Sequence, residues 1–331
     1  MDRRPLPLAP IFLEKIWGGT RLAGLFPAKG VPAGRPVGES WEIAARPDHA
    51  SPVAAGPYAG ATLAGLVVRF GPVLTGTRGR AEGDGRFPLL GKFIDAAEDL
   101  SLQVHPDDAY ALARTGDLGK MEAWYVIDAR PGARIVKGLR PGCGRDDFKR
   151  LLAAGRVAEC LNAFPVQAGE VVFLPPRTLH AIGAGLVLYE IQQNSDVTYR
   201  AWDWGRTEPD GRPRALHVDQ VLEVADLAPP AANTAPLPPP VRGRPRLLVD
   251  CRYFVFEELR PAGPGLVRAP ADRFLALTAV RGEGRLDGMP VAAGNSFCLP
   301  AGCRARLEPG PDLVLLAAMV PPRVDWLEEG V

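Results

Sequence analysis

The stretch FPLLGKFIDAAEDLSLQVHPDDAYALARTGDLGKMEAWY, residues 87–125, combines strand-like apolar runs with side chains that can bind metals and anions. Within it, LSLQVHP alternates apolar and polar residues, so Gln103 and His105 share one face of a predicted strand. Glu122 begins a second predicted strand, EAWYVID, and Lys120 lies on the same face as Glu122. We therefore expect a β-structure whose neighbouring strands present polar side chains to a common interior.

These side chains indicate a metal site in that interior. Imidazole and carboxylate groups on neighbouring strands form a ligand set that suits zinc, iron, nickel or manganese. The four histidines stand at positions 49, 105, 180 and 217, and His180 opens a predicted strand after the proline-rich turn of LPPRTLHAIG. His180 is therefore the best candidate for a further ligand beside Gln103, His105 and Glu122. The competing interpretation is that a lone strand histidine is a surface or hydrogen-bonded residue.

Turn-forming residues separate many short apolar runs along the whole chain. The sequence contains 37 glycines and 35 prolines, and this density is typical of an all-β protein with frequent turns. Helix signals are few: Asp107 or Asp108 can cap one short helix. A second helical segment is expected around 145–162, where Asp146 or Asp147 can act as the cap and Gly155 weakens the middle. The predicted fold class is all-β dominated, with a few short helices.

A change in composition divides the chain. Residues 228–246, APPAANTAPLPPPVRGRPR, are rich in Pro and Ala and predict a linker or an extended strap. We expect a first domain over 1–227 that binds metal, and a second, metal-free barrel over 247–331. The second barrel contains no histidine, and Cys303 stands where a ligand would be expected. Metal binding by Cys298 and Cys303 is the less favoured alternative.

Composition excludes several classes of function. The chain has 331 residues, 47% hydrophobic content and a formal net charge of +1, so it can bury a large core and offers no basic surface for nucleic acid or an anionic membrane. No apolar run is long enough for a signal peptide or a membrane span. Five cysteines without a C-x-x-C pair argue against a disulfide framework. We expect a cytoplasmic protein with no obligate protein partner evident.

Seven sequence blocks are spread over most of the first two-thirds of the chain. They are EKIWGG (14–19), GESWEIA (38–44), FPLLGKFIDA (87–96), LSLQVHPDD (100–108), GKMEAWYVIDA (119–129), GEVVFLPPRTLHAIG (169–183) and YEIQQNSDVTYRAWDWGR (189–206). In this order and spacing, the blocks resemble the class I mannose-6-phosphate isomerases of the short bacterial type, which are zinc enzymes of the cupin superfamily. The resemblance implies two cupin domains, each a β-barrel or jelly roll.

The resemblance implies interconversion of mannose 6-phosphate and fructose 6-phosphate through an enediol or enediolate. It also implies one zinc ion per chain on Gln103, His105, Glu122 and His180, with Arg200 as a catalytic residue. If the strand after Glu190 continues unbroken, its parity aims Arg200 into the same cavity mouth as His180. The proton shuttle stays open at this stage. Its candidates are Glu190 and Asp196, with Lys120 next.

The predicted substrate contacts are of two kinds. Lysine and arginine side chains suit a sugar phosphate, because an arginine presents a planar fork and a lysine a compact charge. Aromatic and carboxylate side chains in EKIWGG and GESWEIA are of the kind that line sugar sites, although both tryptophans could simply pack the core. The predicted substrate-binding residues are Trp17, Glu39, Lys92, Ser101 and Arg206.

Three alternatives remain from the sequence. A cupin dioxygenase would bind iron through several histidines, and Gln103 at the first ligand position argues against it. A non-catalytic sugar-binding cupin would not need the four metal ligands together with Arg200. A same-fold isomerase for free mannose or glucose 6-phosphate is the nearest competitor, and a substrate screen separates it from the favoured function.

Overall fold

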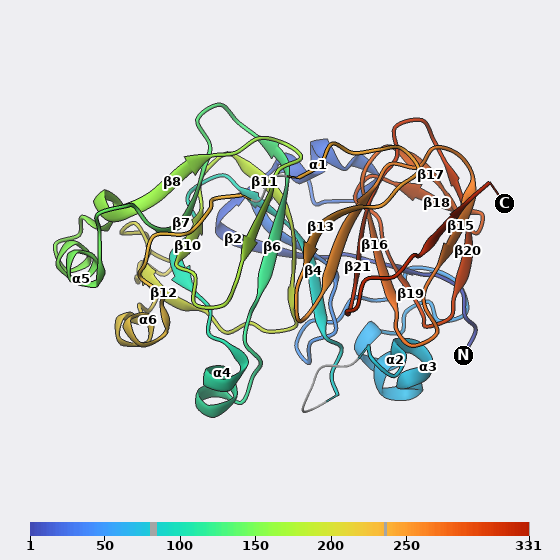
Figure 1. Cartoon of the computed structure of the whole chain (residues 1–331), viewed down its shortest axis with the longest axis horizontal. Helices are drawn as coiled ribbons and strands as arrows, with labels where there is room; N and C mark the ends of the chain where they lie inside the picture. The colour runs from blue at the N-terminus through green and yellow to red at the C-terminus, as the bar shows by residue number, and fades with distance from the viewer. Residues whose placement is uncertain (80–84, 235–236, 331) are drawn as a thin grey trace.

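The computed structural model describes residues 1–79, 85–234 and 237–330. Over these residues, the strands form four sheets that lie one behind another along the long axis of the molecule (Figure 1). An outer five-stranded sheet and a six-stranded sheet make the first half, and a second six-stranded sheet and another five-stranded sheet make the second half. The chain is therefore dominated by β-structure with a few short helices, as the sequence predicts.

The first half is a sandwich of antiparallel strands whose two sheets face each other. Its five-stranded sheet has the order β12 (Tyr199–Trp202), β5 (Leu102–Val104), β10 (His180–Ile182), β7 (Arg134–Leu139), β8 (Leu161–Pro165). Its six-stranded sheet has the order β2 (Ile11–Gly19), β3 (Val37–Ile43), β4 (Leu89–Ala96), β11 (Leu186–Gln193), β6 (Glu122–Ala129), β9 (Val171–Leu174).

The second half repeats this arrangement, with one strand from the other end of the chain. Its six-stranded sheet has the order β1 (Leu6–Leu8), β19 (Ser296–Leu299), β16 (Leu275–Arg281), β21 (Val314–Met319), β14 (Val255–Leu259), β13 (Arg246–Asp250). Its five-stranded sheet has the order β18 (Met289–Ala292), β17 (Glu283–Leu286), β20 (Arg304–Pro309), β15 (Gly265–Arg268), β22 (Leu327–Glu329).

Strand β1 lies outside the domain that the sequence analysis assigned to it. Leu6 pairs with Cys298 and Leu8 with Ser296, so the N-terminal strand extends a sheet built otherwise from residues 246–319. For the rest of the chain, the division into residues 1–227 and 247–331 stays a prediction. One apolar cluster contains buried residues from both ranges, so the two halves pack against each other.

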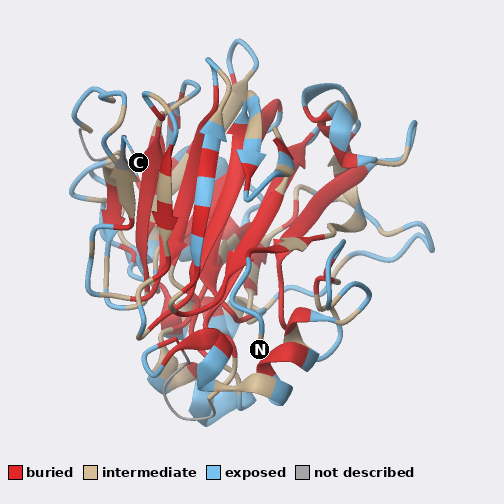
Figure 2. Ribbon diagram, turned by 90° about the vertical axis from the view of Figure 1, so that its right-hand side faces the viewer, coloured by how far each residue is buried: buried red, intermediate tan, exposed pale blue. Residues whose placement is uncertain are grey.

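The two central sheets are buried on both faces. On β11, Val187, Tyr189 and Ile191 belong to the apolar cluster between the halves, whereas Leu186 and Leu188 belong to the interior of the first half. Successive side chains point to opposite faces of a strand, so one strand serves both interiors. The outermost strands differ: β20 alternates exposed and buried residues, and Figure 2 shows buried colour through most strands and exposed colour mainly in the loops.

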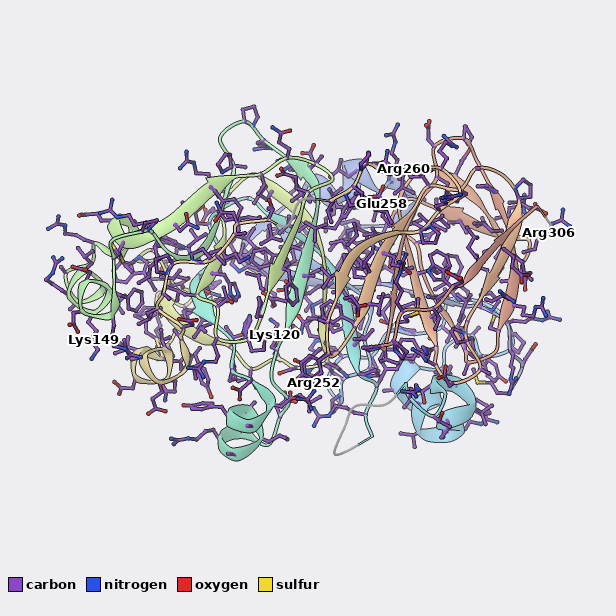
Figure 3. All side chains as sticks on the ribbon, viewed as in Figure 1. Lys120, Lys149, Arg252, Glu258, Arg260 and Arg306 are labelled. Carbon is purple, nitrogen blue, oxygen red and sulfur yellow. The ribbon has the colours of Figure 1, made fainter. Side chains whose placement is uncertain are left out.

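Buried ion pairs lie on both sides of the junction between the halves. Lys29 Nζ lies 2.6 Å from Glu42 Oε1 and donates to the Gly294 carbonyl at 2.8 Å. On the other side of the junction, Glu258 pairs with Arg246 and with Arg260 (Glu258 and Arg260 are labelled in Figure 3). Burial lowers the pKa of Lys29 and raises that of Glu42, so each charge depends on its partner.

The helices are short, and the capping predictions have mixed outcomes. Asp107 caps α4 by accepting from the Tyr110 N–H at 2.9 Å, as predicted. The prediction of Asp146 or Asp147 for α5 is wrong: Gly144 is the N-cap, and Asp147 accepts from its N–H at 3.4 Å. The helices are α1 (Arg21–Leu25), η1 (Pro27–Lys29), α2 (Leu63–Phe70), α3 (Pro72–Thr75), α4 (Asp108–Thr115), α5 (Arg145–Ala153), η2 (Val157–Cys160) and α6 (Val218–Val224).

The segment around 145–162 is two helices rather than one. Gly155 has a φ of 69°, a left-handed conformation that commonly follows a helix C-terminus, and it separates α5 from η2. In the linker 228–246, residues 235 and 236 lie outside the described residues. Its described part contains turns and bends before β13 and packs on the first half, where Lys137 Nζ donates to the Ala232 carbonyl at 2.9 Å. Among the described residues, no helix is long and apolar enough to cross a membrane.

Candidate active site

Three predicted metal ligands meet between the two sheets of the first half. His105 directly follows β5 and His180 begins β10, both in the five-stranded sheet, whereas Glu122 begins β6 in the facing sheet. Their ligand atoms lie within 4.8 Å of one another, and all three residues are buried. His180 Nε2 is 3.2 Å from Glu122 Oε1, and His105 Nε2 is 3.5 Å from Glu122 Oε2.

Backbone carbonyls fix the orientation of both imidazoles. His105 Nδ1 donates to the Val197 carbonyl at 2.9 Å, and His180 Nδ1 donates to the Thr178 carbonyl at 2.8 Å. Because Nδ1 carries the proton in each neutral ring, each Nε2 presents a lone pair to the cluster. Burial lowers the pKa of His105 well below its usual value, and the nearby Lys120 ammonium acts in the same direction, so this imidazole stays neutral and able to ligate.

The carboxylate of Glu122 lacks the partners that burial normally demands. Neither of its oxygens has a hydrogen-bond partner within the described chain, and His105 Nε2 is likewise without one. Burial opposes ionisation of this carboxyl group, but the positive charge of Lys120 outweighs it, so the pKa of Glu122 lies well below the usual range. Two imidazole lone pairs and an ionised carboxylate without donors are the donor set of a divalent metal site, so these residues fit a metal ion.

Gln103 borders the same cluster. It pairs in register with His180 across β5 and β10, and its Nε2 lies 3.3 Å from His180 Nε2. Its Oε1 accepts from Ser101 Oγ at 3.3 Å. The amide therefore lies next to His180, and ligation of a metal by Gln103 is a proposal, as it is for the other three residues.

A cavity of about 330 Å³ is lined by Gln103 and Lys120, the neighbours of His180 and Glu122. It is lined mainly by charged and polar side chains from both sheets and from the segments after β11 and β12. The lining residues are Lys15, Trp17, Glu39, Lys92, Ile94, Leu100, Ser101, Gln103, Lys120, Ile182, Glu190, Asp196, Thr198, Arg200, Arg214 and His217. A cavity of this polarity suits a small hydrophilic ligand.

Two glutamates surround the ammonium group of Lys92 on the six-stranded sheet. Lys92 Nζ lies 3.1 Å from Glu190 Oε1 and 3.5 Å from Glu39 Oε1. Burial opposes the charge on Lys92, but the two carboxylates outweigh it and raise the pKa of the lysine. Burial also opposes ionisation of Glu39, yet Lys92 and Lys15 lower the pKa of Glu39 to about 2. Lys92 is thus part of a charge network within the protein.

The two carboxylates proposed as proton shuttles occupy different environments. Glu190 is buried and accepts from Trp124 Nε1 at 2.7 Å. Burial raises its pKa, the charge of Glu122 adds to this effect, and Lys92 and Lys120 oppose it. Asp196 lines the same cavity but is exposed to solvent. Because Glu190 is buried and its pKa is raised, we favour Glu190 over Asp196 as the group that exchanges protons with the substrate.

Arginine side chains from β12 and from the loop after it line the cavity. The predicted continuous strand is interrupted, because β11 ends at Gln193 and β12 begins at Tyr199, yet Arg200 still lines the cavity. Its N–H donates to His217 Nδ1 at 3.1 Å and its Nη1 donates to the Ala215 carbonyl at 2.9 Å. These bonds hold residues 215–217 against β12.

The chain is similar to known proteins over most of its length. A family model described as the phosphomannose isomerase type I catalytic domain matches residues 6–120. A mannose-6-phosphate isomerase of Streptococcus mutans is 37% identical over 301 residues, covering 88% of this chain and 92% of that protein. The mannose-6-phosphate isomerase ManA of Bacillus subtilis is 35% identical over 308 residues, covering 91% and 95%. The chain belongs to the type I phosphomannose isomerase family.

The fold of this family member agrees with a crystal structure from the same family. The mannose 6-phosphate isomerase of Bacillus subtilis superposes with a TM-score of 0.82 at 33% identity, covering 95% of this chain and 99% of that chain. The resemblance drawn from the seven sequence blocks is confirmed, and the protein is an enzyme, an isomerase. Both halves are cupin-type sandwiches, each made of two facing sheets.

One predicted substrate residue of this phosphomannose isomerase lies elsewhere. Arg206 is absent from the cavity lining that the described residues form. Its guanidinium is held by the Asp203 carboxylate at 2.6 Å and by the Asp99 carbonyl. Arg214 is held by the same Asp203, at 2.7 Å between Nε and Oδ2, and does line the cavity.

Four polar lining residues of the site were not identified from the sequence. Lys15 lies two residues before Trp17 on β2 and shares its face, so the period of the strand could have found it. Thr198 lies two residues before Arg200 in a quoted block. Arg214 and His217 follow β12 in a loop without a periodic pattern, and nothing in the sequence alone marks them.

Proposed function

We propose that the protein interconverts mannose 6-phosphate and fructose 6-phosphate. One observation carries this proposal: a single polar cavity holds Gln103 and Lys120, which lie next to His180 and Glu122 of the cluster, together with the guanidinium groups of Arg200 and Arg214. An isomerase that acts on a sugar phosphate needs a group to stabilise charge at the reacting carbons and a separate anion-binding group. The related proteins named mannose-6-phosphate isomerase support the same substrate.

The cofactor in this proposal is one zinc ion per chain, held by Gln103, His105, Glu122 and His180. When bound, zinc would supply Lewis acidity that favours negative charge on the sugar oxygens at C1 and C2. The carbonyl contacts of His105 and His180 keep their Nε2 atoms directed at the cluster. Lys120 Nζ, 3.4 Å from Glu122 Oε2, adds a positive charge beside the same reacting oxygens.

In this proposal, side chains of the protein transfer the proton between C2 and C1 of the sugar. In the open-chain aldose, a base removes the proton from C2 to form the enediol or enediolate. A proton then passes from the C2 oxygen to the C1 oxygen, and the base returns its proton to C1 to give the ketose. Glu190 is our candidate for this shuttle, because its pKa is raised by burial and it lies inside the cavity. Arg200 stabilises the negative charge that develops on the oxygen during this transfer. The exposed Asp196 is the alternative shuttle.

The phosphate group in this proposal binds to the cationic side chains of the cavity wall. Arg200 and Arg214 offer guanidinium groups, and Lys15 offers an ammonium group. Asp203 holds Arg214 in place and also binds Arg206, which can therefore act on the phosphate site only through Asp203. Trp17, Glu39, Lys92 and Ser101 line the cavity wall and are proposed to contact or orient the sugar.

The test of the function is a coupled assay on purified protein with metal analysis. We expect about one zinc per chain, loss of turnover with a chelator and recovery when zinc is added. Mannose 6-phosphate should exceed free mannose in kcat/KM by orders of magnitude, since binding energy at the remote phosphate orients the reacting carbons. Full turnover by metal-free protein would remove the metal from the proposal. Equal rates on free mannose, or faster turnover of glucose 6-phosphate, would identify the competing isomerase.

A matched pair of variants tests the phosphate site. Arg214→Ala and Arg206→Ala each remove one arginine from Asp203, but only the first removes a cavity-lining charge. We expect the larger rise in KM for mannose 6-phosphate with Arg214→Ala, and little change in KM for free mannose. A larger rise with Arg206→Ala would reassign the phosphate contact to Arg206.

A further inference from the structure

The segment that carries Lys120 is fixed at four successive residues. The Leu118 carbonyl accepts from Ser195 Oγ at 2.6 Å, and the Gly119 N–H donates to Asp108 Oδ1 at 2.8 Å. The Lys120 N–H donates to the Pro106 carbonyl at 3.1 Å, and the Met121 N–H donates to Gln193 Oε1 at 2.9 Å. The segment runs directly into Glu122, so its position also affects the start of β6.

The carboxylate of Asp108 accepts three hydrogen bonds that connect this segment to other parts of the chain. Its Oδ1 accepts both from Gly119 and from Gln193 Nε2, the latter at 2.9 Å. Its Oδ2 accepts from Tyr253 Oη at 2.7 Å, and Tyr253 belongs to the loop between β13 and β14 of the second half. A hydroxyl group of the second half therefore holds the carboxylate that orders the Lys120 segment of the first half.

The contact between the segments around Asp108 and Lys120 is close enough to transmit a displacement. A Cβ atom on Gly119 would lie 2.5 Å from the backbone of Asp107 and Asp108, so the two backbones touch and only glycine fits. Pro106 immediately follows the ligand His105. A shift of Asp108 would accordingly move Gly119 and Lys120 relative to the metal cluster.

The Tyr253 contact lies beside open space rather than within a packed core. A cavity of about 580 Å³ at the junction of the halves is lined by Asp108, Gln193 and Tyr253, among others. Tyr253 and Asp108 are both partly exposed. Figure 3 labels Lys120 in the first half and Arg252, the neighbour of Tyr253, in the second. Removing the hydroxyl group alone leaves no hole in an apolar core, so its effect on stability should be small.

We propose that Tyr253 is a positioning residue of the second half, which acts through Asp108 on Lys120 in the catalytic cavity of the first half. The assignment rests on the proposed function for the role of Lys120, and it gives the second half a direct part in turnover. Lys120 lies 3.4 Å from Glu122, and its place relative to the reacting oxygens depends on the four backbone contacts of residues 118–121.

The experiment compares Tyr253→Phe with a matched control, Tyr125→Phe. Tyr125 also carries its hydroxyl across the junction, 3.5 Å from Glu258 Oε2, but its contact is not part of the Lys120 segment. We expect Tyr253→Phe to lower kcat roughly tenfold, since small displacements of catalytic groups reduce rate strongly. The KM for mannose 6-phosphate, the metal content and the unfolding midpoint should stay near wild type, and Tyr125→Phe should leave kcat unchanged.

A second pair at Asp108 keeps the test decisive if Tyr253→Phe folds poorly. Asp108→Asn retains an oxygen for Gly119 and Gln193, and its amide can donate to the Tyr253 oxygen, so kcat should stay near wild type. Asp108→Ala removes all three contacts and should lower kcat at least as much as Tyr253→Phe, and combining the two should lower kcat no further.

Two results would overturn the assignment. One is a kcat for Tyr253→Phe, or for Asp108→Ala, equal to that of Tyr125→Phe. The other is a loss in Tyr253→Phe that appears only in KM or metal content. Wild-type protein is assayed in the same series: if it fails to convert mannose 6-phosphate, the proposed function fails, whereas an active wild type with unaffected variants refutes only the role of Tyr253.

Discussion

The two halves of this molecule have the same sandwich architecture but opposite interiors. Between the sheets of the first half lie the His105–Glu122–His180 cluster and a polar cavity. Between the sheets of the second half lies an apolar cluster that includes Leu277, Phe297 and other buried aliphatic side chains. Two facing sheets therefore provide the frame, and the residues at inward positions decide between a reactive site and a packed core.

One buried contact is common to both interiors. Trp124 Nε1 donates to Glu190 at 2.7 Å in the first half, and Trp326 Nε1 donates to Glu257 at 2.7 Å in the second. The second half neutralises its carboxylate with Arg323, at 2.7 Å, whereas Glu190 faces Lys92 and the cavity. The same pair can thus stabilise a core or hold a reactive group, depending on what lies beside the carboxylate.

Substituting a cluster histidine of the first half and a cysteine of the second half should give the largest difference between the halves. His180→Ala should lose the metal and lower turnover by roughly 10³-fold or more, because a bound metal ion contributes several kcal/mol to transition-state stabilisation. Cys303→Ala in the second half should retain full metal content and turnover. Turnover assays with metal analysis check both. Metal loss in Cys303→Ala would show that the second half also binds a metal.

The buried ion pair at the junction should give the next largest effect. Lys29→Met leaves Glu42 buried without its cation and should lower the free energy of unfolding by about 3–5 kcal/mol. Lys29→Met combined with Glu42→Gln should recover most of this loss, because no unpaired charge remains. Denaturant unfolding measures both. A single variant as stable as wild type would mean that the halves do not depend on this pair.

Acid should act mainly through the charged interior of the first half. Glu39 has a pKa of about 2 in the fold against its usual 4.5, so its stabilisation is complete above pH 4.5 and is lost as the pH falls toward 2. Glu39→Gln should therefore lose about 3 kcal/mol less unfolding free energy than wild type between pH 5 and pH 2. The control is Glu308→Gln, an exposed carboxylate of the second half, which should follow wild type. Identical pH profiles for Glu39→Gln and wild type would contradict the assignment.

Substitution of the two buried tryptophans should give the smallest effect and should differ between the halves. Trp326→Phe leaves a Glu257 oxygen without its donor and should lower the unfolding free energy by about 1–3 kcal/mol, with turnover unchanged. Trp124→Phe removes the donor to Glu190 beside His180 and should lower kcat as well. Parallel unfolding and kinetic measurements distinguish them. A fall in kcat for Trp326→Phe would show that the second core affects the active site.

Local patterns in the sequence predicted the cluster well. Period-two alternation put Gln103 and His105 on one face of a strand, His105 belongs to the cluster, and Gln103 lies beside His180. Local patterns predicted less where a tertiary contact decided the position of a side chain. Asp147 was expected to cap α5, but it accepts from the Gly144 N–H and leaves the cap position to glycine. Arg206 lies in a quoted block, yet Asp203 and the Asp99 carbonyl hold it away from the cavity lining.

The sequence by itself determined the family and the β-rich character, and it predicted the three side chains that cluster between the sheets, because these depend on residue type, strand period and short spacing. The tertiary structure alone decided that Arg214 rather than Arg206 lines the cavity, and that Tyr253 reaches Asp108, 145 residues away. Contacts of this kind arise when separate sheets pack. No local period records which side chains will meet across them, so only the assembled sheets specify the residues that surround the ligands.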